Sequence, residues 1–193
     1  YTYANRDKFV GTFPKATTNL SVGTYFYLNE TDKCDTYVGF MQMDKMHGQG
    51  RLTFSDGDTF EGEWKQGIPL KGTLTRCIAY NAAPAFERRI GPVNNDYRLH
   101  GKGEVVVYKH TSRRDDSILL RAQGNFNNGT VSGQATIEVF GATWYTTFKG
   151  TVQKQKKHKG KEQIFHSTKD VHALPRTGQQ IDSTLKINSF AID

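Results

Sequence analysis

An aromatic–glycine repeat in the first half of the chain limits what this sequence can fold into. The letters YVG at 37–39 are followed by HGQG at 47–50 and by the pair Asp56-Gly57. The pattern restarts 23 residues after Tyr37, as FEGEW at 60–64. A fixed period of this length indicates a repeat architecture, in which each unit packs mainly against its neighbours.

The residue types within one unit predict a β-hairpin. Side chains two apart in a strand share a face, so Phe60, Gly62 and Trp64 are expected in line on one face. We expect the glycine between two aromatic residues to leave space for a ring from a neighbouring unit. Gly57 and Gly67 are expected at hairpin turns, where φ is positive and a side chain is strained. Stacked hairpins predict an all-β fold, an elongated and twisted antiparallel sheet.

Weaker copies of the unit extend along the chain. FVGTF at 9–13 has the opening pattern, HGKG at 100–103 copies 47–50, and further openings lie near 124–129 and at 148–152. Ala135 stands where one of these copies lacks its glycine. The predicted strands are 36–42, 49–55, 58–65, 70–77, 103–109, 118–126, 133–140, 143–152 and 161–166. The residues with an expected structural role in the repeat are Gly39, His47, Gly48, Gly50, Gly57, Gly62, Gly67, His100, Gly101, Gly103, Gly124, Phe126 and Gly150.

The repeat resembles the MORN family (membrane occupation and recognition nexus). The resemblance is carried by an aromatic-x-Gly-x-aromatic opening, a Gly turn and His-Gly-x-Gly at a period of about 23 residues, and it is most specific over 37–72. It implies an array over 9–165, with insertions near 78–86 and 110–117. Residues 1–8 and 166–193 are expected to be non-repetitive caps or tails. MORN arrays also occur attached to catalytic domains, but we identify no such domain in this sequence.

Positive charge is concentrated in the second part of the chain. The formal net charge is +7; residues 1–75 hold 8 Lys/Arg against 9 Asp/Glu, and residues 76–193 hold 18 against 10. The densest run contains Lys154, Lys156, Lys157, Lys159 and Lys161. It is either a solvated turn or a site for an anionic surface such as phospholipid headgroups. Nucleic acid is a less favoured partner, because no aromatic stacking motif accompanies the lysines.

No constellation of catalytic residues emerges from the sequence. His47 and His100 belong to the repeat, so we expect them to pack or hydrogen-bond within their hairpins. The other histidines lack the pairing that a zinc site needs, and no glycine-rich phosphate loop with a lysine is present. The sequence therefore predicts a protein that is not an enzyme and has no cofactor or metal. Cys34 and Cys77 are either free thiols or a disulfide, and two free thiols are the favoured reading.

The absence of catalytic groups and the extended array favour an architectural role. The first hypothesis is a scaffold or accessory subunit that holds proteins in a larger intracellular assembly, with Tyr37, Phe60 and Trp64 as a partner-binding face. The alternative for these rings is that they fill the core of the array itself. A second hypothesis is a peripheral membrane adaptor that binds anionic phospholipid through the five lysines. A third is an RNA-contacting subunit of an organellar complex.

Overall fold

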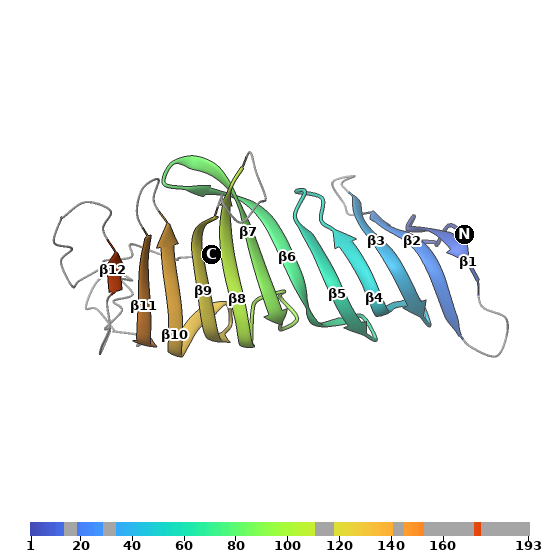
Figure 1. Ribbon diagram of the computed structural model, residues 1–193. Coiled ribbons are helices and arrows are strands. Elements are labelled where there is room, and N and C mark those ends of the chain that lie inside the picture. Colours follow the sequence, from blue (N-terminus) through green and yellow to red (C-terminus); the bar gives the residue numbers. More distant parts are fainter. Residues whose placement is uncertain (14–18, 29–33, 111–117, 141–144, 153–171, 175–193) are drawn as a thin grey trace, which may run out of the picture.

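The described part of the chain folds as one antiparallel β-sheet. The computed structural model describes residues 1–13, 19–28, 34–110, 118–140, 145–152 and 172–174. These residues form twelve strands and no helix, and the order of the strands in the sheet is their order in the sequence (Figure 1). The all-β prediction is therefore confirmed. The strands are β1 Lys8–Thr12, β2 Leu20–Leu28, β3 Cys34–Gln42, β4 Lys45–Thr53, β5 Thr59–Lys65, β6 Ile68–Tyr80, β7 Ala83–Pro92, β8 Gly101–Lys109, β9 Ile118–Asn127, β10 Thr130–Phe140, β11 Tyr145–Val152 and β12 His172–Leu174.

Four of the hairpins turn through two residues with positive φ. These are the pairs 43–44, 66–67, 81–82 and 128–129, and Gly67 and Gly129 occupy the second position in two of them. Two consecutive positive φ angles match the right-handed twist of the flanking strands. The tight turns keep successive strands adjacent, which produces the simple strand order.

A row of small residues crosses the sheet, one from each strand from β1 to β11. Consecutive members are direct cross-strand partners, with one exception. Gly91 and Gly103 are not paired, but they are close: a Cβ added to Gly91 would lie 3.0 Å from the Cα of Gly103. Ala135 is the one member with a side chain, and it pairs with both Gly124 and Gly150. The members are Gly11, Gly23, Gly39, Gly50, Gly62, Gly72, Gly91, Gly103, Gly124, Ala135 and Gly150.

Large side chains cover this row on one face of the sheet. Phe9 lies against Gly11 and Gly23, and Tyr37 lies against Gly39 and Gly50. Beside these four glycines the space is filled by a ring of the same hairpin. A Cβ on Gly62 would meet the backbone of Lys71 and Gly72 first, and not a ring from a neighbouring unit as the sequence suggested. A side chain on the glycine would collide with either the ring or the adjacent backbone. The repeat therefore needs glycine because of close packing within one hairpin.

Two segments outside the regular strands cover parts of this core face. The loop between β7 and β8 brings Tyr97 against Phe54, Phe60 and Trp64, with ring centroids 5.1–5.8 Å apart. Burial, assisted by the charge of Asp35, raises the pKa of Tyr97 to about 12. At the N-terminal end, Tyr3 packs on Tyr25 at 5.3 Å. A single sheet has a bare apolar face unless something covers it, and these segments supply that cover.

The structure adds four strands that the predicted set lacks: β1, β2, β7 and β12. The last of these lies in the predicted C-terminal tail or cap and pairs with β11. β2 pairs with β1, the strand that contains most of FVGTF at 9–13. β2 contributes Gly23 to the glycine row, but it has no aromatic-x-Gly-x-aromatic opening of its own. The predicted insertion near 78–86 is the tip of the β6–β7 hairpin, where Tyr80 pairs with Ala83. It lengthens two strands and leaves the sheet continuous (Figure 1). The predicted strand 161–166 and residues 111–117 lie outside the described residues.

Candidate interaction surfaces

The three rings proposed as a partner-binding face are core residues. Tyr37, Phe60 and Trp64 are 0%, 0% and 1% exposed. The rings of Tyr37 and Phe60 meet the indole of Trp64 edge-on, at centroid distances of 5.6 Å and 5.3 Å. No partner reaches them in the folded chain, which corrects the expectation of an aromatic binding face. The reason is that Tyr97 and its loop cover the face that the strand pattern alone leaves open.

The two repeat histidines occupy different environments. His47 is partly buried on β4 and pairs with Phe40 of β3, next to a bulge at 48–49 in β4. Its Nδ1 atom is buried without a hydrogen-bond partner in the described part of the protein. His100 is exposed, and its backbone N–H donates to the carbonyl of Pro92 at 2.9 Å. Neither histidine forms a side-chain hydrogen bond or ion pair with another catalytic type of residue within the described part of the chain.

The other repeat residues divide between the glycine row and the turns. Gly48, Gly57, Gly67 and Gly101 have positive φ, from 63° to 116°. Phe126 is buried in the core cluster and pairs with Gly101. These positions act on the backbone or the core.

Several predicted features fall on residues without a described placement. Lys154, Lys156, Lys157, Lys159 and Lys161 all lie outside the described residues.

The two cysteines are free thiols in the described part of the chain. Cys34 is half-buried and Cys77 is exposed. Where the chain is described, no group of three or more His, Cys, Asp or Glu residues is placed to hold a metal ion. No helix in the described ranges is long and apolar enough to cross a membrane.

An exposed apolar patch lies on the opposite face of the sheet, over β1, β2 and β3. Val22 and Phe40 are direct cross-strand partners. Thr24 lies between Val10 and Val38, which are its partners on either side. We call this the outer-face patch, and its apolar members are 38–52% exposed: Val10, Leu20, Val22, Val38 and Phe40. Clusters of exposed apolar side chains of this kind mark interaction sites on soluble proteins.

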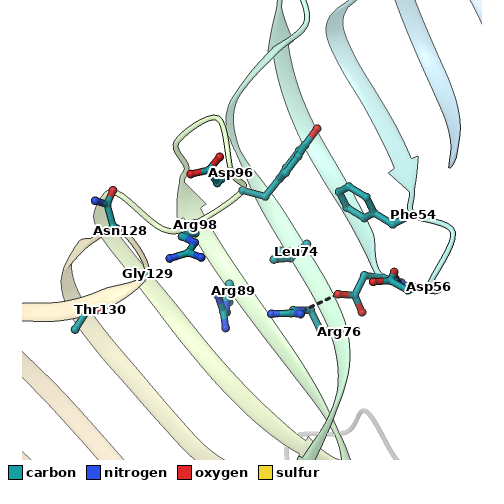
Figure 2. A pocket seen from close by; sticks show the side chains of 12 residues that line it. Phe54, Asp56, Leu74, Arg76, Arg89, Asp96, Arg98, Asn128, Gly129 and Thr130 are labelled. Carbon is teal, nitrogen blue, oxygen red and sulfur yellow. Dashed lines mark hydrogen bonds and ion pairs between the residues drawn. The ribbon is translucent and has the colours of Figure 1, made fainter. Parts of the chain in front are cut away.

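A polar pocket of about 270 Å³ interrupts the core face near the middle of the sheet. Figure 2 shows Arg89, Arg98 and Asn128 on one side of it, and Phe54 and Asp56 on the other. Arg76 lies between them and forms an ion pair with Asp58 at 2.7 Å. We call this the arginine pocket. The sequence analysis missed it, because its residues come from β6, β7, the start of β10 and three loops, which only the folded sheet brings together.

Comparison with known protein families identifies the repeat. The MORN repeat matches residues 37–59 and 60–69, which include the clearest units of the sequence pattern and the hairpins from β3 to β5. No curated protein matched the chain. The MORN repeat is a non-enzymatic module that generally serves in interactions with proteins or membrane lipids. The chain therefore contains MORN repeats over residues 37–69, within an all-β sheet that the glycine row crosses.

Proposed function

We propose that the protein is a non-catalytic scaffold or accessory subunit that holds other proteins in a larger assembly. The outer-face patch is the observation that carries this proposal. The sheet buries its aromatic rows on one face, yet the other face presents Val10, Leu20, Val22, Val38 and Phe40 to solvent at one end. Burying these side chains against a partner is favourable at about 25 cal/mol per Å² of apolar surface.

The edge of the sheet supports a role for this end of the molecule. β1 is an edge strand, and open edges tend to pair with other chains unless they are covered. Residues 1–7 turn back onto it: the N–H of Phe9 donates to the carbonyl of Tyr1 at 2.8 Å, and the Tyr1 amino group donates to the carbonyl of Phe9. This covers β1 only up to Phe9. Beyond Phe9, β2 is the one described strand that pairs with β1, so a partner on the outer-face patch can also meet the open edge at 10–12.

The test uses variants of the patch and a matched control. Val38→Thr with Phe40→Thr keeps strand-compatible side chains and removes apolar surface from the patch. The control is Ile68→Thr, which removes exposed apolar surface at the start of β6, away from the patch on β1 to β3. We expect the tagged protein to elute from native extract in a stable complex, which the patch variant loses and the control keeps. A monomer in native extract, or a complex indifferent to the patch variant, contradicts the proposal.

A second candidate function is peripheral attachment to an anionic membrane. The sequence observation that favours it is the run of five lysines from 154 to 161 in a strongly basic second part of the chain. Each lysine near an anionic membrane contributes about 1 kcal/mol, which together gives reversible attachment. Liposome binding with and without these charges tests this candidate.

A further inference from the structure

Two core-facing positions of β7, at and beside the arginine pocket, hold charged side chains where their cross-strand neighbours are apolar. Arg89 lies on β7 between Leu74 of β6 and Val105 of β8, and both of these partners are buried core residues. Glu87, two residues earlier, faces the same way and pairs with Val107. The side chains of Glu87 and Arg89 are each 3% exposed and form an ion pair with each other.

Such a pair is an expensive way to fill a core. Removing two charges from water costs several kcal/mol per ion, and apolar residues of similar volume are often as stable or more stable. The ion pair is therefore not explained by stability alone. An arginine at such a core position indicates that its guanidinium group has another role, such as binding a ligand.

The guanidinium of Arg89 is incompletely satisfied by the protein. Its Nε donates to Glu87, while its Nη2 atom is buried and has no hydrogen-bond partner in the described part of the protein. Arg89 lines the pocket, so its guanidinium group borders a space open to a ligand. An unpaired buried donor costs about 1–3 kcal/mol, and an acceptor in the pocket recovers this once the guanidinium group turns toward it.

A second arginine stands at the mouth of the same pocket. Arg98 is exposed, and its side chain forms no ion pair with the described residues. Gly129 lies between the two arginines: a Cβ added to it would lie 3.6 Å from the Cβ of Arg98 and 3.8 Å from Nη1 of Arg89. With glycine there, the space between the two side chains stays open. Arg76 is already neutralised by Asp58.

We infer that the arginine pocket binds a carboxylate, the side chain of an acidic residue in a peptide segment of a protein partner. Planar guanidinium groups match a carboxylate in geometry and form charge-assisted hydrogen bonds with it. A phosphate group fits less well, because Asp56, Asp58 and Asp96 also line the pocket and repel a second negative charge. A volume of about 270 Å³ accommodates one side chain rather than a large ligand.

This inference rests on the proposed scaffold function for the nature of the partner, but its binding site is on the other face of the sheet. The outer-face patch and the arginine pocket can therefore fail separately. If the patch variant keeps the complex while the pocket binds a carboxylate, only the scaffold proposal is contradicted. If the patch variant loses the complex while the pocket ignores carboxylates, only the present inference is contradicted.

The experiment measures binding of short peptides to the whole chain. The probes are acetyl-Gly-Glu-Gly-amide and the matched Gln peptide, with inorganic phosphate as a third ligand, at constant ionic strength. The backbone amide signal of Gly129 reports binding by NMR. We expect saturable binding of the Glu peptide, and binding of the Gln peptide and of phosphate weaker by about tenfold, the size of a single charge-assisted hydrogen bond.

Two variants and a control locate the site. Arg98→Gln changes an exposed residue and is expected to weaken Glu-peptide binding by about tenfold. Arg51→Gln removes the same charge from an exposed position on the opposite face and is expected to change nothing. Glu87→Gln with Arg89→Gln neutralises the buried pair together and is expected to abolish binding. If this double variant does not fold, Arg98→Gln decides alone.

Three results overturn the inference. The first is equal binding of the Glu and Gln peptides, or no binding of the Glu peptide. The second is binding that Arg98→Gln leaves unchanged. The third is tighter binding of phosphate than of the Glu peptide, which assigns the pocket to a different anion.

Discussion

The indole ring of Trp64 packs edge-on against the phenol ring of Tyr37, with centroids 5.6 Å apart and planes at 84°. Tyr37 opens one MORN unit and Trp64 belongs to the opening of the next. Edge-to-face pairs of this kind contribute about 0.5–1.5 kcal/mol beyond the area that they bury. The contact therefore ties one hairpin to its neighbour, which is how a repeat array shares a core.

The glycine row predicts a steep cost for any side chain at Gly62. A Cβ there would lie 2.7 Å from the Cα of Gly72 and still closer to the carbonyl oxygen of Lys71. Because backbone atoms cannot move aside cheaply, we expect Gly62→Ala to cost about 1–3 kcal/mol of unfolding free energy and Gly62→Val more. Urea denaturation measures it. Ala135→Gly, in the same row, is the matched control and should cost less than about 1 kcal/mol; equal effects contradict this account.

Tyr97 is predicted to support the core although it lies in a loop. Tyr97→Ala removes ring contacts to Phe54, Phe60 and Trp64. We expect the free energy of unfolding to fall by about 2–3 kcal/mol, less than for a fully buried ring, because Tyr97 is partly exposed. The emission of Trp64 should also shift to longer wavelength as water reaches the indole. A Trp144→Phe background isolates that signal. Tyr97→Phe keeps the ring and should leave the emission unchanged; if Tyr97→Ala also leaves it unchanged, the loop does not cover this core.

Buried tyrosines predict a loss of stability at high pH. Burial raises the pKa of Tyr37 and Tyr97 from 10.0 to about 12 in the folded chain. The neutral form is therefore favoured by folding: its contribution is complete below pH 10 and is lost as pH rises through about 12. Unfolding free energy from urea titrations should fall over that range. The slope should be shallower in Tyr97→Phe than in the parent chain, whereas an identical slope would show that Tyr97 ionises as freely when folded.

The buried ion pair predicts a non-additive pair of substitutions. Glu87→Gln leaves the charge of Arg89 buried and uncompensated, so we expect a loss of about 3–5 kcal/mol. Adding Arg89→Gln removes the orphaned charge and should recover part of that loss. A double-mutant cycle of unfolding free energies measures the coupling. If the double variant is less stable by the sum of the two single losses, the two side chains do not interact as the structure has them.

Membrane attachment predicts dependence on both charge and salt. If the second candidate function holds, the protein should float with liposomes that contain anionic lipid and be released above roughly 0.15 M salt, where the screening length is about 8 Å. Replacing Lys154, Lys156, Lys157, Lys159 and Lys161 by Gln together should abolish flotation. Neutral liposomes are the control. Flotation that survives both the salt and the substitutions excludes this mechanism.

The local pattern of the sequence determined the hairpins of the repeat. Aromatic-x-Gly-x-aromatic sets which side chains share a face, and a glycine at the second turn position, as at Gly67, sets where the chain reverses. Both signals act over a few residues, so they can be recognised in the sequence. They were sufficient to predict the all-β sheet and its antiparallel hairpins from 34 to 77.

The tertiary structure decided what lies over the sheet and which surfaces remain free. Strand β7 has no glycine–aromatic opening, and it is a strand because β6 and β8 pair with it on both sides. Tyr97 covers the rings of β5 from a loop that follows β7, and Arg89 meets Leu74 only through strand register. These contacts depend on which residues the register places opposite each other, and a local pattern contains no information about that. The core face, the outer-face patch and the arginine pocket therefore exist only once the strands are assembled.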